Sequence, residues 1–192
     1  VVNVNRQIYV IVERTINGGT RTFLELLDNE YHTDAASKQT NGSPITTWTV
    51  SHLANTEVVV KSGNYSMGTF TTNGSGQLTL TDAVSSVEIG INYTPTMTTL
   101  PPEFTLQDGI SVGQKRRIVR AVLDLNETLD VKTKGTSILI RRVTDDFSLE
   151  PTPVSQRKEI YLLGWSSEGT VTITQDQPLP LTLNGLLLEV EI

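Results

Sequence analysis

The chain has 192 residues, of which 37% are hydrophobic and 19% are charged, as is typical of a globular protein that buries a sizeable core. It contains no cysteine, which excludes disulfide bonds and thiolate metal sites. The net charge of −6 is opposite to the basic balance usual in domains that grip nucleic-acid phosphates. The sequence has no apolar run near the roughly 20 residues that a membrane-spanning helix needs.

The chain opens with VVNVNRQ, without an initiator Met or a signal-peptide pattern, so we expect a fragment or a processed product. The first predicted element is a β-hairpin over residues 8–27. Ile8, Val10 and Val12 alternate with residues of the opposite face, which is the period of a strand. Asn17-Gly18 follows, and both residues tolerate the positive φ of a type I′ turn.

The glycine pair Gly18-Gly19 also raises the question of a phosphate-binding loop. Such a loop needs a Lys-Ser/Thr pair and a following helix, so that backbone N–H groups converge on the anion. Here residues 20–22 are Thr-Arg-Thr and lead into another apolar stretch. The glycines therefore predict a turn between two strands.

Two polar segments divide the rest of the chain. Residues 32–47 are small and polar with Gly and Pro, and residues 94–114 contain three prolines, so both predict loops or linkers. Residues 48–93 between them contain about five short strands, with turns at Asn55, residues 62–64, residues 73–76 and Asp82. That size favours a small β-barrel.

Alternation continues through the second half of the chain, where Val119, Ala121, Leu123 and Leu125 share a predicted face. Residues 170–174 and 186–192 alternate in the same way, and no helical stripe is present, so the fold class is all-β. We expect residues 1–32 and 99–192 to form a β-sandwich-like domain, with residues 46–98 inserted as the small β-barrel. The alternative is two consecutive domains that divide near residue 98.

Metal and cofactor sites are not indicated. His32 and His52 lie 20 residues apart in a chain without cysteine. Residues 124–130, DLNETLD, supply oxygen ligands at alternate positions, but Leu129 stands where a calcium loop requires Gly. The polar face of a strand explains this spacing better, and we expect no metal and no cofactor.

Catalytic constellations are equally weak, so we expect a protein that is not an enzyme. Ser51 and His52 are neighbours, which in a strand places them on opposite faces. A glycosidase needs two carboxylates; Glu25 and the pair Asp145-Asp146 are available, but a solvated charge is the simpler interpretation.

Basic residues form the strongest candidate interaction patch, which comprises Lys115, Arg116, Arg117, Arg120, Arg141 and Arg142. Arg157 and Lys158 form a further basic pair. One interpretation is contact with DNA or with an acidic neighbouring subunit. The other is protection of exposed sheet edges by charged side chains.

Three stretches resemble a known family. IYVIVERTINGGTRTFLELLD (residues 8–28) resembles a hairpin of tail nozzle proteins of short-tailed bacteriophages, the tail tubular protein B-like group. Residues 51–101 resemble the small barrel that follows it in that group, a barrel sometimes likened to the FCCH domain of ubiquitin-activating enzymes. VTITQDQPLPLTLNGLLLEVEI, at residues 171–192, is similar to the group's C-terminal strands.

The resemblance implies the C-terminal portion of a larger, non-catalytic structural protein of the virion. Such nozzles form sixfold rings, line the DNA exit channel without specific DNA binding, and contact adaptor and portal-side proteins and fibres or spikes. An alternative is a carbohydrate-binding or host-adhesion β-module, whose sugar platform would need exposed aromatic residues such as Trp48 and Trp165. A β-structured hydrolase is a third hypothesis, supported only by abundant carboxylates.

Overall fold

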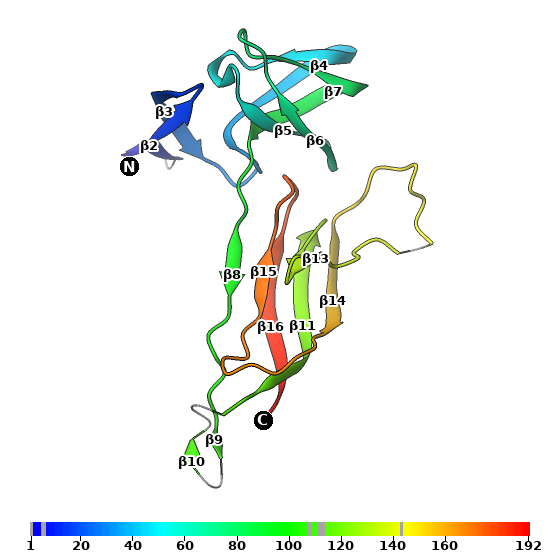
Figure 1. The fold of residues 1–192 in the computed structure, drawn as a ribbon. Helices are drawn as coiled ribbons and strands as arrows, with labels where there is room; N and C mark the ends of the chain where they lie inside the picture. Colours follow the sequence, from blue (N-terminus) through cyan, green and yellow to red (C-terminus); the bar gives the residue numbers. More distant parts are fainter. Residues whose placement is uncertain (1, 5–6, 107–108, 111–113, 143) are drawn as a thin grey trace. The chain divides into compact units, whose positions relative to one another are not determined.

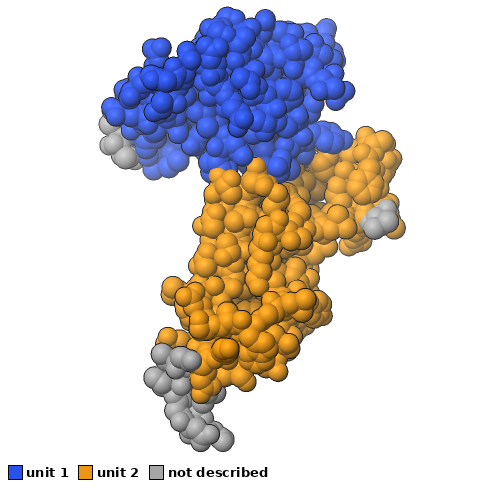
Figure 2. Space-filling model, viewed as in Figure 1, with its two compact units in different colours: residues 1–93, 177–179 blue, residues 94–176, 180–192 orange. Residues whose placement is uncertain are grey.

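The computed structural model describes residues 2–4, 7–106, 109–110, 114–142 and 144–192. Strands dominate it, and one 3₁₀ turn is the only helical element among these residues, so the predicted all-β class is confirmed. The chain divides into two compact units, shown in Figure 2. Unit 1 comprises residues 1–93 with 177–179, and unit 2 comprises residues 94–176 with 180–192.

Unit 1 begins with a small antiparallel sheet of three strands, β1 (Val2–Val4), β2 (Gln7–Ile16) and β3 (Gly19–Leu27). Strands β2 and β3 form the predicted hairpin, with Ile16 paired to Gly19. The connecting residues Asn17 and Gly18 have φ values of 50° and 72°, which is the conformation that a type I′ turn requires. Ile16 is buried in the core of unit 1, so this end of the hairpin is anchored by packing.

The larger sheet of unit 1 has the strand order β4-β7-β5-β6 (Figure 1). Its strands are β4 (Asp34–Thr49), β5 (Glu57–Ser62), β6 (Tyr65–Thr71) and β7 (Gln77–Ile91), with the 3₁₀ turn at Ser51–Leu53. The first part of β4 pairs with the end of β7 and the last part with its beginning, with register shifts between them. The two long strands therefore bend together around a core that contains Trp48, Leu53, Val58, Val60, Leu78 and Ile89.

Two sequence predictions in this region are wrong. Most of the predicted loop at residues 32–47 belongs to the strand β4, and Asp82 lies inside β7 rather than at a turn. The polar residues of β4 gave no alternating pattern, and the strand forms because β7 supplies its backbone partners. The turns predicted at Asn55 and residues 62–64 are confirmed, since Asn55 and Gly63 both have positive φ.

Unit 2 contains two further antiparallel sheets, with strand orders β14-β11-β16 and β13-β12-β15-β8. The long strands of the first are β11 (Arg117–Thr128), β14 (Val154–Tyr161) and β16 (Thr182–Glu191). The short strands of the second are β8 (Thr96–Thr98), β12 (Lys132–Thr133), β13 (Thr136–Ser137) and β15 (Thr172–Thr174). A separate pair joins β9 (Thr105–Leu106) to β10 (Gly109–Ile110).

The core of unit 2 lies on the inner side of β11. Ala121, Leu123 and Leu125 are buried as the alternation predicted, together with Val131, Val171 and Ile173. Val119 is not part of this core, and Ile118 takes its place. The register against β16 shifts between Ile118 and Arg120, so a β-bulge reverses the alternation at this point.

The division of the chain differs from the expected insertion of residues 46–98 into a domain made of 1–32 and 99–192. The boundary falls at residues 93 and 94, close to the alternative of two consecutive domains. Among the described residues, Ile16 and Phe23 of the hairpin pack on the core of unit 1, whereas the core of unit 2 is built from residues 118–190. The alternation of residues 8–12 identified a strand, but the sequence pattern did not show which core that strand joins.

Candidate interaction surface

The sheet β14-β11-β16 has an inner side that covers the core of unit 2 and an outer side, called here the outer face. Because successive side chains of a strand point in opposite directions, the neighbours of the buried core residues lie on this outer face. It is formed by Arg117, Arg120, Val122 and Asp124 of β11, Arg157, Glu159 and Tyr161 of β14, and Leu187, Glu189 and Glu191 of β16.

Arg120 lies on the central strand and pairs with a carboxylate on each side. Its Nε donates to Glu189 Oε2 at 2.9 Å, and its Nη1 lies 3.4 Å from Glu159 Oε2. The hydrogen bond to Glu189 and the negative charge of Glu159 raise the pKa of Arg120 above its ordinary value. Arg120 thus joins all three strands across the outer face.

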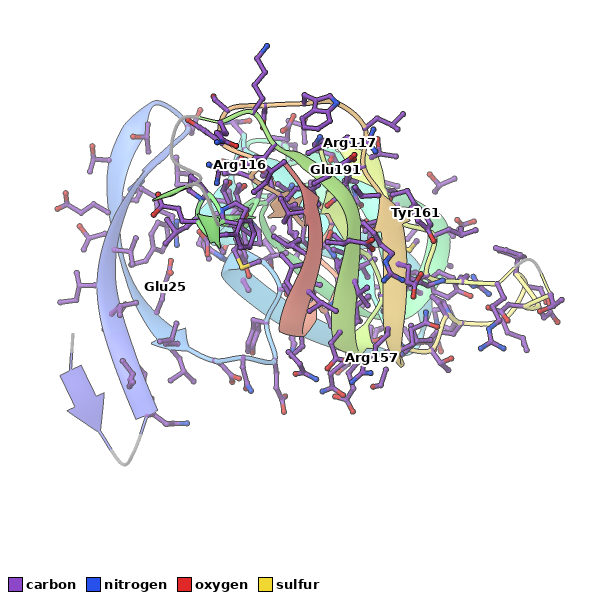
Figure 3. The ribbon with its side chains drawn as sticks, turned by 90° about the horizontal axis from the view of Figure 1, so that it is seen from below. Glu25, Arg116, Arg117, Arg157, Tyr161 and Glu191 are labelled. Carbon is purple, nitrogen blue, oxygen red and sulfur yellow. The ribbon has the colours of Figure 1, made fainter. Side chains whose placement is uncertain are left out.

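Two further ion pairs lie toward opposite ends of the sheet (Figure 3). Arg117 Nη2 is 2.7 Å from Glu191 Oε2, and Arg157 Nε is 3.6 Å from Asp124 Oδ1. The three arginines carry +3 and the four carboxylates of the outer face carry −4, so the face has a net charge of about −1. A surface of this kind has little attraction for the phosphates of DNA.

Apolar side chains lie among these ion pairs and are largely exposed. Tyr161 is 71% exposed and Leu187 is 67% exposed, and Leu187 is the cross-strand partner of Val122. Trp165, which follows β14, is 51% exposed, and the Arg117 guanidinium lies 5.6 Å from the centre of its ring. Tyrosine, tryptophan and arginine are the residues most enriched at protein–protein interfaces.

The predicted basic patch is divided by the structure. Arg117 and Arg120 are paired on the outer face, while Lys115 is exposed and Arg116 is buried. Arg116 donates to the carbonyl oxygen of Pro102, and its backbone forms a bridge with Ser166. Arg116 therefore has a structural role within unit 2.

Arg141 and Arg142 lie in the loop before β14 and stabilise that loop. Arg141 donates to the carbonyl oxygen of Asp146 at 2.7 Å, and its guanidinium lies 4.5 Å from the centre of the Phe147 ring. The backbone N–H of Arg142 donates to Asp145 Oδ2 at 2.7 Å. The interpretation as protection of sheet edges can hold only for basic residues on an edge strand. Arg157 and Lys158 lie on the edge strand β14, whereas Arg117 and Arg120 lie on the central strand β11.

The carboxylates considered for catalysis all have structural partners. Glu25 binds Arg14 through both oxygens, at 2.8 and 3.1 Å, and Arg14 also donates to Asp34. Asp146 accepts hydrogen bonds from the backbone and the hydroxyl of Ser148, and these bonds lower its pKa. These contacts favour roles in holding loops and strands together.

The residues considered for metal binding are also occupied by local contacts. His52 lies in the 3₁₀ turn, not in the strand we assumed, and its Nε2 is 2.9 Å from the carbonyl oxygen of Ala35. Asp124 and Asn126 lie on β11, as the strand interpretation of DLNETLD predicted. In the part of the chain that the structure describes, no cluster of three potential metal ligands is found.

One group of charged residues was missed by the sequence analysis. Glu88 of β7 is buried and accepts hydrogen bonds from the backbone of His32 and the hydroxyl of Thr33. Lys61 of β5 lies beside it and contacts His32. The three charged or titratable residues are separated by 27 residues or more in the sequence. Strand pairing brings Lys61 and Glu88 together, and the segment that leads into β4 brings His32 to them.

Comparison with known proteins adds no relative, since neither a family model nor a curated protein sequence matches the chain. Among the described residues, no helix has the length and apolar character needed to cross a membrane.

Proposed function

We propose that this chain is a non-catalytic structural module that associates with other protein subunits through the outer face. One observation supports this function best. Tyr161, Leu187 and Trp165 are exposed, and they lie among ion pairs in which opposite charges neutralise each other. Apolar and aromatic groups supply the buried centre of an interface, and paired charges form a polar rim.

The partner that fits the outer face is a second copy of the chain. Positive and negative side chains alternate across the three strands, as in the row Glu159–Arg120–Glu189, so two copies can meet without facing like charges over a wide area. Contact between the same face of two copies is self-complementary and produces a two-fold pair. The resemblance of three stretches to tail nozzle proteins of short-tailed bacteriophages points in addition to a ring, which a head-to-tail contact through another surface would close.

In this proposal the subunit belongs to the virion tail and surrounds a channel through which DNA passes. The net charge of −6 suits passage of DNA without retention. Adaptor, portal-side and fibre or spike proteins would be the neighbouring components. The arginines of the outer face serve protein contacts, because each already has a carboxylate partner.

Sedimentation velocity over a concentration series tests the proposed association. We expect the mean mass of the wild-type chain to rise above the 21.1 kDa of the monomer as concentration increases. Leu187→Asp should abolish the rise, because it places a charge at the apolar centre of the contact. A wild-type chain that stays monomeric at every concentration contradicts the proposal.

The matched control is Leu24→Asp, because Leu24 lies in the hairpin of unit 1 and is 70% exposed, compared with 67% for Leu187. The control should associate as the wild type does. If both substitutions weaken association equally, the outer face is not the surface responsible. Far-UV circular dichroism checks that each variant retains its β-structure.

A carbohydrate-binding module is a second candidate, favoured by the exposure of Tyr161 and Trp165, because aromatic rings form stacking platforms for sugars. Trp48 is buried in the core of unit 1 and does not contribute. Titration of Trp165 fluorescence with polysaccharides, with Trp165→Ala as the control, distinguishes the two functions. A saturable change that Trp165→Ala removes would support the carbohydrate module.

A further inference from the structure

Glu88 is a carboxylate in an almost completely buried position, with 4% of the residue exposed. A buried charge is costly unless it is paired and hydrogen-bonded. Its Oε1 accepts the backbone N–H of His32 at 2.6 Å and the hydroxyl of Thr33 at 3.1 Å. Both donors belong to the connecting segment, defined here as residues 28–33 between β3 and β4. Glu88 thus binds the connecting segment to β7.

Lys61 completes this group, which we call the Glu88 cluster (Glu88, His32, Thr33 and Lys61). Lys61 is the cross-strand partner of Glu88 on β5, and its Nζ lies 3.0 Å from His32 Nδ1. Because a lysine ammonium only donates, His32 Nδ1 is the acceptor in this contact. His32 Nδ1 is itself 4.0 Å from Glu88 Oε2.

Opposing effects set the pKa of Glu88. Burial acts to raise the pKa, but the hydrogen bonds from His32 and Thr33 and the positive charge of Lys61 outweigh burial and hold the pKa below its ordinary value. The ionised carboxylate is therefore the form that the folded unit prefers. Lys61 shows the converse effect, because burial lowers its pKa despite the attraction of Glu88.

An ion pair joins the hairpin to the start of β4. Arg14 of β2 donates to Glu25 of β3 and to Asp34 at the start of β4. At Gly90 of β7 the backbone approaches the connecting segment so closely that an added Cβ would lie 2.7 Å from Thr33 Cβ. The far end of the hairpin is held by apolar packing of Ile16, which does not depend on pH.

We propose that the Glu88 cluster is an acid-sensitive latch, which holds the connecting segment on β7 and releases it when Glu88 becomes protonated. Protonation removes the only negative charge in the cluster. The hydrogen bonds that the His32 backbone and the Thr33 hydroxyl donate are weaker to a neutral carboxyl than to a carboxylate, so protonation favours opening. The apolar core of unit 1 stays folded because it contains no titrating group.

The direction of the pH dependence follows from the groups around Glu88. An open segment returns Glu88 to a carboxyl pKa of about 4.3, whereas the closed segment holds it lower, so the latch is closed above this pH and opens as the pH falls below it. The charged or titratable neighbours are Lys38 on β4, Lys61 on β5, His32 in the connecting segment, and Asp34 and Tyr93 beside it. Asp34 is paired with Arg14.

Hydrogen exchange measured by mass spectrometry on the full chain between pH 7 and pH 3 tests the latch. After correction for intrinsic rates, the opening constant of amides 29–33 should rise up to about tenfold per pH unit below about pH 4.3. Amides of β5, such as Val58 and Val60, should keep their protection over the same range. The proposal is overturned if the connecting segment keeps its protection, or if it loses protection together with β5.

Two variants separate the charge from the hydrogen bonds. Glu88→Gln should leave the connecting segment open at pH 7 and remove the pH dependence, while Thr33→Val should lower protection at every pH and keep the same slope. The matched control Asp82→Asn changes an exposed acid on the same strand and should behave as the wild type. A steep pH dependence that persists in Glu88→Gln contradicts the latch. If that variant does not fold, the wild-type experiment decides: amides 29–33 must lose protection at a higher pH than the amides of β5.

Discussion

The Glu88 cluster of unit 1 and the outer face of unit 2 place their charged residues in opposite environments. In unit 1, Glu88 is 4% exposed and its partners come from two other segments of the chain. In unit 2, the ion pairs of the outer face are open to solvent, and the side chain of Arg157 is 76% exposed. Buried charges must be satisfied for the fold to persist, whereas exposed pairs contribute little to stability. This difference is the basis for proposing that the Glu88 cluster serves the fold and that the outer face serves association.

The largest expected effect tests whether the two units are independent. Leu123→Ala in the core of unit 2 should lower stability by about 2–5 kcal/mol, because it leaves a cavity at a fully buried site. Ile89→Ala should do the same in unit 1. Hydrogen exchange of each unit in both variants checks this prediction, and each substitution should affect only its own unit. Equal losses in both units would show that they unfold together.

The same substitution at a buried and an exposed glutamate sharpens the comparison directly. Glu88→Gln should lower the stability of unit 1 by about 1–3 kcal/mol, since it removes charge-assisted hydrogen bonds from a buried site. Glu159→Gln, on the outer face, should leave the urea midpoint of unit 2 unchanged within error. Urea denaturation at pH 7, monitored by hydrogen exchange in each unit, measures both stabilities. A larger effect for Glu159→Gln would reverse the assignment of roles.

The hairpin turn provides a smaller test that involves no charge. Gly18 has a φ of 72°, and a residue with a Cβ loses about 1–2 kcal/mol in this region. Gly18→Ala should therefore destabilise the hairpin by about that amount, although the structure leaves open space for the methyl group. Thermal unfolding and exchange of β2 amides measure the loss. Unchanged protection of β2 would mean that the turn does not control pairing of the hairpin.

The smallest expected effect concerns Lys61 in alkaline solution. Because burial lowers the pKa of Lys61 in the folded state, the unfolded chain holds its proton more tightly. The stability of unit 1 should therefore rise with pH between the folded pKa and the unfolded value of about 10.4. Lys61→Gln should remove this rise. Urea midpoints at several alkaline pH values test it, and a rise that persists in Lys61→Gln would have another source.

Local patterns predicted the hairpin and most long strands. Asn17-Gly18 specifies its own turn by backbone conformation, and the apolar alternation of Ala121, Leu123 and Leu125 identified the buried side of β11. The strand β4 was missed because its residues are mainly Ser, Thr, Asn and Gln, whose pairing depends on β7. Val119 was misplaced because a bulge leaves no clear mark in a single sequence.

The charge partners were beyond the reach of local patterns. Arg117 and Arg120 suggested a positive patch because basic residues cluster near them, but Glu191 and Glu189 reach them from β16. Arg120 and Glu189 are 69 residues apart, and His32 and Glu88 are 56 residues apart. Only the fold determines such pairs, and across a sheet the register of the strands sets them. Neither the nearly neutral outer face nor the Glu88 cluster was therefore predicted.

The central claim is that copies of the chain meet through the outer face, and the absence of cysteine permits a direct measurement. Leu187→Cys and Leu24→Cys each introduce one exposed thiol, and treatment with a short bis-maleimide cross-links thiols that approach each other between copies. We predict that Leu187→Cys gives covalent dimers at concentrations where Leu24→Cys stays monomeric on a denaturing gel. Equal cross-linking of the two variants, or none at Leu187→Cys, would contradict the account.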